Sequence, residues 1–234
     1  MAYNLNDKLV IAISSRALFD LEEENQIFEK DGLDAYYKYQ LENEDKSLKK
    51  GTGYRLVENI LKINSFFSSD ERQVEVIILS KNNAATSLRI TNAINDLKLD
   101  IIRSAWTSGT NISNYLKAFK VDLFLSADDN DVLNAIENGV AAAKILHSNE
   151  NINNSSNNQV RIAFDGDAVL FSEESELVYK NHGLEAFIEH EKENRNNPLE
   201  MGPFAKLLLT IAKIQAKFPT DKSPIRTALV TARS

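Results

Sequence analysis

Two aspartates, Asp165 and Asp167, directly follow an apolar run, 160–164, that has the pattern of a β-strand. In an open parallel sheet, ligands bind beyond the carboxyl ends of the strands. Gly166 lets the backbone turn tightly between the aspartates, so that both side chains can approach one reacting phosphorus. Two close carboxylates repel each other, and a divalent cation such as Mg²⁺ relieves this repulsion. The pair therefore predicts a metal-assisted phosphoryl site, and the alternative is an ordinary Asp-Gly-Asp turn.

A hydroxyl group follows the second apolar run of this region. The run covers 225–230, and Thr231 comes directly after it. A doubly wound sheet can place this strand end beside Asp165, where the hydroxyl would face the same ligand. Taken alone, Thr231 is better explained as the N-cap of a following helix.

The chain repeats itself at an offset of 151 positions. Residues 11–83 align with residues 162–234 without a gap, and apolar positions match throughout that length. Identical pairs include Ile11/Ile162, Gly32/Gly183, Gly51/Gly202, Leu56/Leu207 and Phe67/Phe218. One register over this length indicates a duplicated α/β unit. In place of Asp165 and Asp167 the first copy has Ser14 and Arg16, which suits a structural turn or a site lost after duplication.

Each copy predicts a strand, a polar turn, three helical stretches and a second strand. The first copy has strands at 9–13 and 74–79 with helical stretches at 22–30, 32–45 and 53–66. The second has strands at 160–164 and 225–230 with helical stretches at 173–181, 183–196 and 204–217. Between them we expect helices at 84–97, 112–119 and 131–146, strands at 100–106 and 121–125, and an Asn/Ser-rich linker at 148–159. This alternation predicts an α/β fold with a parallel sheet, divided into a first copy at 1–147 and a second at 160–234.

Composition excludes several classes of function. A chain of 234 residues that is 43% hydrophobic can bury a sizeable core, and its net charge of −7 argues against a nucleic-acid scaffold. The absence of Cys excludes disulfides, thiolate metal sites and a Cys nucleophile. The apolar runs are too short or too interrupted to span a bilayer, and no targeting segment is visible. We therefore expect a cytoplasmic protein that binds neither nucleic acid nor membrane.

Several strings resemble a known family. Segments 164–169 (FDGDAV) and 230–233 (VTAR) look like the first two motifs of the haloacid dehalogenase superfamily of phosphotransferases. More specific strings are 13–20 (ISSRALFD), 82–83 (NN), 164–176 (FDGDAVLFSEESE), 182–184 (HGL), 189–192 (EHEK), 197–199 (NPL) and 224–226 (PIR). They resemble the cytosolic type I 5′-nucleotidases over essentially the whole chain. The resemblance implies a three-layer Rossmann-like sandwich in which the inserted helical segment 173–217 forms a cap over the substrate.

The resemblance also implies hydrolysis of nucleoside 5′-monophosphates to nucleoside and phosphate with Mg²⁺. Asp165 would be the nucleophile that forms an aspartyl-phosphate, and Asp167 would protonate the leaving 5′-oxygen and then deprotonate water. Phosphate oxygens would be held by Thr231 and by backbone N–H groups at Gly166 and Ala232. Mg²⁺ would bind the carboxylate of Asp165 and the carbonyl group of Asp167.

Three further residues are candidate substrate ligands. Arg233 follows the phosphate motif, and Arg16 and Asn82 lie at strand ends of the first copy, where the second copy positions phosphate. Arg89, in contrast, is interpreted as a solvated residue on a helix face. The superfamily also uses a Lys and an acidic pair on later strands, and we therefore expect this chain to be truncated. In the first copy, segment 126–129 (SADD) occupies the position equivalent to the acidic pair, and the second copy has no such segment.

Two other functions stay open. The degenerate first copy also suits a non-catalytic or truncated nucleotide-binding protein, and the motifs also suit a phosphatase of this superfamily that acts on another small phosphoester. The open sheet edge after Val230 is prone to association, which makes a homo-oligomer a candidate state.

Overall fold

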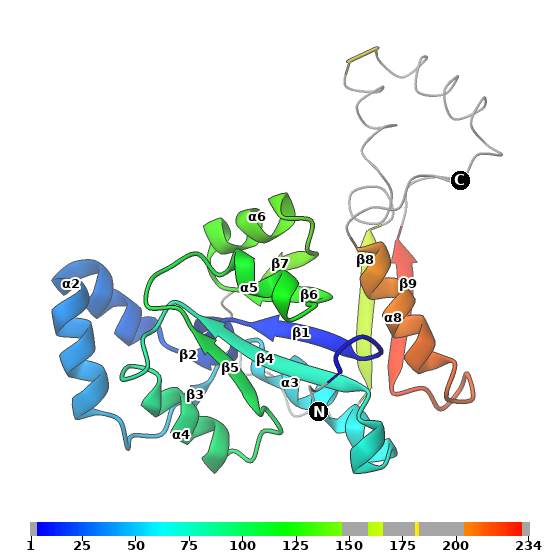
Figure 1. Ribbon diagram of the computed structural model, residues 1–234, viewed down its shortest axis with the longest axis horizontal. Helices are drawn as coiled ribbons and strands as arrows, with labels where there is room; N and C mark the ends of the chain where they lie inside the picture. Colours follow the sequence, from blue (N-terminus) through cyan, green and yellow to red (C-terminus); the bar gives the residue numbers. More distant parts are fainter. Residues whose placement is uncertain (1–3, 147–158, 166–180, 183–203, 231–234) are drawn as a thin grey trace. The chain divides into compact units, whose positions relative to one another are not determined.

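A computed structural model of the chain describes residues 4–146, 159–165, 181–182 and 204–230 (Figure 1). The chain divides into two compact units, Met1–Asn158 (unit 1) and Gln159–Ser234 (unit 2). The predictions for Gly166, Asp167, Thr231, Ala232 and Arg233, and for most of the cap segment, lie outside the described residues.

Unit 1 is built on a five-stranded sheet in the order β5-β4-β1-β6-β7. Its strands are β1 (Leu9–Ile13), β4 (Val74–Ser80), β5 (Arg103–Trp106), β6 (Leu123–Ser126) and β7 (Ala142–Lys144). Every pairing in this sheet is parallel. All residues of β1 and β4 are buried, as the apolar run of β1 and the mostly apolar sequence of β4 predict for parallel strands covered on both faces.

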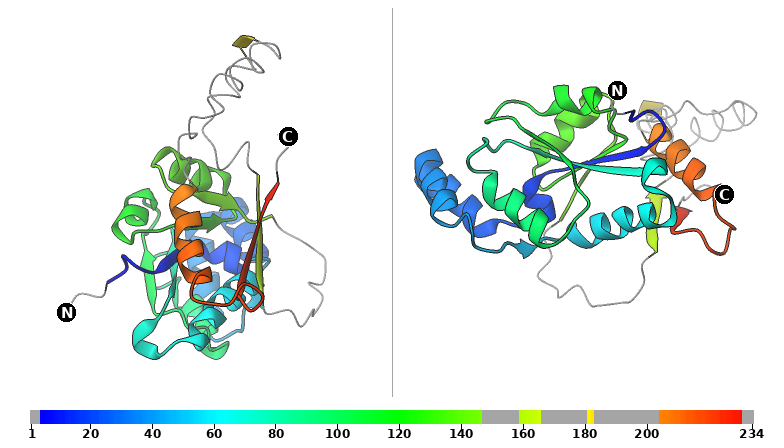
Figure 2. Two further views of the ribbon diagram at one scale, coloured as in Figure 1. Left: turned by 90° about the vertical axis from the view of Figure 1, so that its right-hand side faces the viewer. Right: turned by 60° about the horizontal axis from the view of Figure 1, so that its bottom comes forward.

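Helices cover both faces of this sheet. The helices of unit 1 are α1 (Ser15–Leu18), α2 (Glu22–Glu42), which extends beyond the sheet (Figure 1), α3 (Tyr54–Lys62), α4 (Leu88–Asp96), α5 (Ser113–Ala118) and α6 (Asp129–Glu137). From β1 the chain moves through β4 to β5 and then returns to β6 and β7 on the other side of β1. With right-handed crossovers, α3 and α4 lie on one face and α5 and α6 on the other, as Figure 2 shows. Unit 1 is therefore the expected three-layer sandwich, and its strand order reverses between β1 and β6.

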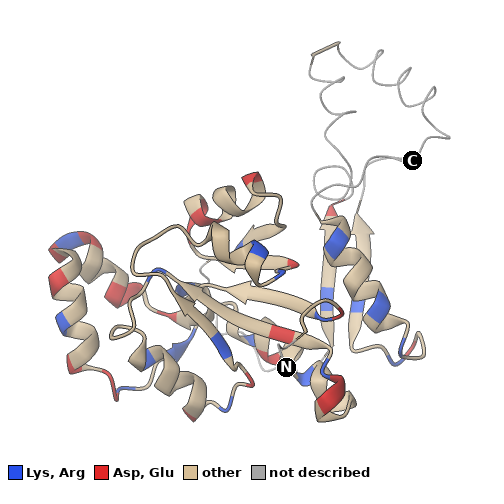
Figure 3. Ribbon diagram, in the orientation of Figure 1, with Lys and Arg blue, Asp and Glu red and all other residues tan. Residues whose placement is uncertain are grey.

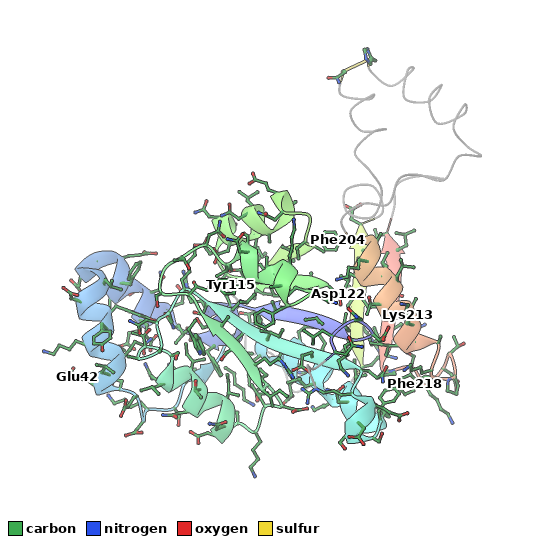
Figure 4. All side chains as sticks on the ribbon, viewed as in Figure 1. Glu42, Tyr115, Asp122, Phe204, Lys213 and Phe218 are labelled. Carbon is green, nitrogen blue, oxygen red and sulfur yellow. The ribbon has the colours of Figure 1, made fainter. Side chains whose placement is uncertain are left out.

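Side-chain alternation along the strands divides the core between these two faces. On one face Val10, Ala12, Leu79 and Phe124 form a buried cluster with residues of α5 and α6. At the amino edge of the sheet, Asp122 Oδ2 accepts a hydrogen bond of 2.9 Å from the backbone N–H of Val10 (Figure 4).

Strands β4 and β5 carry opposite charges, and Figure 3 shows an acidic segment in β4 and a basic one in β5. Glu75 is fully buried in β4 and forms ion pairs with Arg72, at 3.1 Å, and with Arg103 of β5. A buried carboxylate requires such partners because its desolvation is costly.

Unit 2 repeats the central motif of unit 1. Its parallel strands β8 (Val160–Asp165) and β9 (Ile225–Val230) pair so that Val160 lies beside Ile225, as Leu9 of β1 lies beside Val74 of β4. Helix α8 (Ala205–Gln215) begins 151 residues after α3 and buries Leu207, Ile211 and Ile214, which share one helix face. The offset found in the sequence therefore recurs in strand register and in helix position.

Most predicted elements are confirmed, but the helix expected at 131–146 is wrong in its second half. Helix α6 ends at Glu137, and Gly139 follows with a φ of 74°, which favours glycine. The Ala-rich segment then forms β7, which pairs with β6. The short antiparallel pair β2 (Phe19–Asp20) and β3 (Lys49–Lys50) is a further element that sequence periodicity does not predict.

Candidate functional site

The carboxyl end of β8 presents an acidic side chain in unit 2. Asp165 is the last residue of β8 and lies beside Val230, the last residue of β9. Both residues are exposed, whereas Val160 and Phe164 in the same strand are buried. The strand register therefore brings Asp165 to the edge at which parallel sheets bind ligands.

A carboxylate at this edge is suited to two kinds of chemistry. It can attack phosphorus as a nucleophile, and its oxygens are donors that Mg²⁺ prefers. Within the described ranges there is no group of three or more His, Asp or Glu side chains able to hold a metal ion. The second predicted acid, Asp167, and the predicted phosphate ligand Thr231 stay predictions.

The matching edge of unit 1 carries hydroxyl groups. Three neighbouring strands lead into buried serines: Ser14 follows β1, Ser80 ends β4 and Ser126 ends β6. The Ser126 hydroxyl donates to Ser14 Oγ at 3.3 Å, and Ser15 Oγ lies 3.0 Å from Ser80 Oγ. We call Ser14, Ser15, Ser80 and Ser126 the serine edge. It includes the point between β1 and β6 where the strand order reverses, which is the usual ligand position in such sheets.

Arg16 and Asn82, the two predicted substrate ligands of unit 1, lie next to the serine edge. Arg16 Nη2 donates to Glu22 Oε1 at 3.0 Å, while its buried Nε has no hydrogen-bond partner among the described residues. Asn82 Oδ1 accepts a hydrogen bond of 2.8 Å from the Tyr36 hydroxyl. The buried Nδ2 of Asn82 has no partner in the described part of the chain either.

The Tyr36 hydroxyl links α2 to this edge. It accepts a 2.9 Å hydrogen bond from Gln40 Nε2 while it donates to Asn82. Burial raises the pKa of Tyr36, and the hydrogen bonds to Gln40 and Asn82 oppose this rise. The hydroxyl therefore stays protonated at neutral pH and holds the amide of Asn82 with its Nδ2 turned away from Tyr36.

A buried ion pair fixes α2 against α4. Arg89 Nη1 lies 2.5 Å from Glu24 Oε1, and these side chains are only 8% and 6% exposed. Arg89 Nε also donates to the backbone carbonyl group of Lys46 at 3.0 Å. The interpretation of Arg89 as a solvated residue is therefore wrong.

The acidic segment 126–129 of the first copy is used within unit 1. Asp128 caps α6 by accepting from the backbone N–H of Asp131 at 3.0 Å. Asp131 forms an ion pair with Lys81 at 2.6 Å, and Asp129 forms one with Lys144 at 2.7 Å. Sequence reasoning missed Lys81, although its position directly after the strand-end Ser80 was a usable signal.

The parallel sheet, its reversal point and the carboxylate at the end of β8 define an α/β protein with a Rossmann-like fold, as in the haloacid dehalogenase superfamily. A family model described as 5′-nucleotidase matches residues 1–234, and the chain belongs to this family, which confirms the resemblance. Cytosolic 5′-nucleotidase 1B from Homo sapiens is 36% identical over 234 residues, which is 97% of this chain and 38% of the relative. The chain therefore spans less than half the length of this curated relative. In the described part of the chain, no helix has the length and apolar character needed to cross a membrane.

Proposed function

We propose that this chain carries the nucleophile of a phosphoric monoester hydrolase that converts nucleoside 5′-monophosphates to nucleoside and phosphate. The observation that carries the proposal is the position of Asp165, exposed at the carboxyl end of β8 and in register with the end of β9. Family membership supports the reaction class. The human relative, which is named a cytosolic 5′-nucleotidase, supports the substrate class and a cytosolic location.

In the proposed reaction, a carboxylate oxygen of Asp165 attacks phosphorus and the bond from phosphorus to the 5′-oxygen breaks. Asp167 gives its proton to that oxygen, and the nucleoside leaves. Water then attacks the phosphorus of the aspartyl-phosphate, Asp167 takes a proton from the water, and the Asp165 carboxylate is released with phosphate. The proton balance closes because Asp167 ends protonated, as it began.

Further residues would bind the phosphate group, the substrate and the metal ion around Asp165 and Asp167. Thr231 and the backbone N–H groups at Gly166 and Ala232 hold phosphate oxygens, and Arg233 contacts the substrate. The exposed carboxylate of Asp165 fits a hard divalent cation, with Asp167 as the second ligand. When bound, Mg²⁺ would offset the negative charge of the phosphate group.

Phosphate release tests the proposal. With Mg²⁺ present, we expect the chain to release phosphate from AMP in preference to sugar phosphates, and chelation of the metal to abolish release. Asp165→Asn should lower turnover by about 10³-fold or more because an amide is a poor nucleophile. The matched control is Asp221→Asn, an exposed aspartate in the same unit, which should leave turnover unchanged.

Other outcomes would point elsewhere. Unchanged turnover in Asp165→Asn would exclude the covalent mechanism, and preference for a sugar phosphate would favour another phosphatase of the superfamily. Binding of AMP without release would favour the nucleotide-binding alternative. The absence of nucleic-acid partners, a homo-oligomeric state and substrate contacts by Arg16 and Asn82 stay predictions.

A further inference from the structure

We propose that the serine edge of unit 1, with Arg16, Asn82 and Lys81, is a second phosphate site that binds a phosphoryl dianion without metal and without hydrolysing it. The ligand would be inorganic phosphate or the phosphate group of a nucleoside monophosphate. The site is built from residues of unit 1 alone and does not depend on the proposed reaction of Asp165.

The duplication places this site where the second copy has its predicted phosphate motif. At the offset of 151 residues, Ser14 aligns with Asp165 and Arg16 aligns with Asp167. Ser80 aligns with Thr231. The first exchange removes a negative charge, and the second replaces a negative charge by a positive one. A position that holds two carboxylates needs a cation before phosphate can approach, whereas a serine and an arginine attract the anion directly.

Two hydrogen-bond donors without a partner indicate that the serine edge is built to receive an acceptor from a ligand. Arg16 Nε and Asn82 Nδ2 are both buried without a hydrogen-bond partner among the described residues. Buried polar groups in native proteins are nearly always paired, because an unpaired donor keeps its desolvation penalty. Arg16 and Asn82 come from neighbouring strand ends at the same edge of the sheet, since Arg16 directly follows Ser15, whose hydroxyl contacts Ser80, two residues before Asn82.

The ligand class follows from these donors. A guanidinium Nε, an amide NH₂ and serine hydroxyls all donate, and phosphate oxygens are acceptors with matching geometry. Lys81 adds a positive charge directly after Ser80, although it is paired with Asp131. The site would not hydrolyse its ligand, because Ser14 replaces the carboxylate nucleophile and Arg16, which replaces Asp167, cannot act as a base.

One carboxylate of unit 1 competes with the anion. Glu22 Oε1 accepts from Arg16 Nη2 at 3.0 Å, and its side chain is 41% exposed. Because this pair is accessible to water, an incoming phosphate can share or replace it at modest cost. Removal of the Glu22 charge should therefore strengthen phosphate binding, an effect that a purely structural role of Arg16 does not produce.

Calorimetric titration of the full chain in metal-free buffer tests the proposal. Phosphate and AMP should both bind, and adenosine, which has no phosphate group, should not. AMP binding tighter than phosphate would identify a nucleotide as the ligand, and equal affinities would identify phosphate itself. Partly buried Trp106, which pairs with Ser80, gives a fluorescence readout of the same event.

Three variants should move the affinity in different directions. Asn82→Asp keeps the acceptor for Tyr36 but replaces the free donor by an oxygen, and should weaken phosphate binding at least about tenfold. Arg16→Gln should weaken it about fivefold or more, and Glu22→Gln should tighten it about threefold. The matched control Asn95→Asp makes the same exchange at an exposed residue of α4 and should change nothing.

The proposal fails if phosphate does not bind at about 10 mM, or if AMP binds and phosphate does not. It also fails if Asn82→Asp and Arg16→Gln keep the wild-type affinity while their thermal unfolding shows an intact fold. Equal weakening by Asn95→Asp would show only a general charge effect and would also overturn it. Because no metal is present, these results stand whether or not Asp165 supports hydrolysis.

Discussion

The buried ion pair between Arg89 and Glu24 gives the strongest test of how unit 1 is held together. Arg89→Met leaves the Glu24 carboxylate, 6% exposed, without its cation in the contact between α2 and α4. Loss of one partner of a buried pair costs about 3–5 kcal/mol. With a urea dependence of about 2 kcal/mol per molar, the unfolding midpoint should fall by about 2 M.

Tryptophan fluorescence reports the unfolding of unit 1 alone. Trp106 is the only tryptophan of the chain and lies in β5, so fluorescence follows the unfolding of unit 1 in urea. The double variant Arg89→Met/Glu24→Met removes both charges and should recover to within about 1–2 kcal/mol of the wild type, because replacement of a whole buried pair is nearly neutral. The exposed pair Lys38–Glu42 on α2 is the matched control, and Lys38→Met should cost less than about 0.5 kcal/mol.

Two results would refute this reasoning. If Arg89→Met lowers the midpoint no more than Lys38→Met does, the contact contributes no more than a surface pair. If the costs of Arg89→Met and Glu24→Met simply add in the double variant, the two side chains are not coupled.

Four further predictions concern the same unit, each measured by urea unfolding followed through the tryptophan fluorescence. Tyr36→Phe removes the hydroxyl between α2 and Asn82 and should cost about 1–2 kcal/mol at neutral pH; an unchanged midpoint would contradict that link. Because burial raises the pKa of Tyr36, the unfolded state loses this proton first, so wild-type stability should fall as pH rises above about 10, and less so in Tyr36→Phe. Gly53→Ala would put a Cβ 2.6 Å from the carbonyl oxygen of Ala17 and should cost about 1–3 kcal/mol, and a stabilised variant would show that the loop moves freely. Glu75→Gln removes the buried carboxylate that pairs with Arg103 and with Arg72, which keeps its other partner Asp100, and should cost about 3 kcal/mol or more, whereas a cost below about 1 kcal/mol would mean that water solvates the arginines.

The sequence was most informative where one physical rule governs the outcome. Strands β1 and, apart from Glu75, most of β4 were predictable because parallel strands buried between helices read as continuous apolar runs. Strands β8 and β9 were predictable because they align with β1 and β4 at the same offset. The position of Asp165 followed from its place directly after an apolar run. The duplication was visible because identity and apolar pattern kept one register, and the strand pairing has the same offset.

Other features depend on contacts between distant residues. Arg89 looks like any helix-face arginine, because its partner Glu24 lies 65 positions away in the sequence. The segment around Ala142 is rich in a strong helix former, yet a free edge of β6 and the turn at Gly139 decide its structure. The unpartnered donors on Arg16 and Asn82 are likewise a property of the folded edge alone.

The paired registers of the two units have a consequence for the order of folding. Leu9 and Val74 lie 65 residues apart, as do Val160 and Ile225. Closure of a flexible loop of this length costs about 4 kcal/mol of chain entropy before any ladder bond forms. The local turns of α3 and α8 should therefore form before either pair of strands, and pulse-labelled hydrogen exchange should protect helix amides first. Earlier protection in β1 than in α3 would show that long-range collapse precedes helix formation.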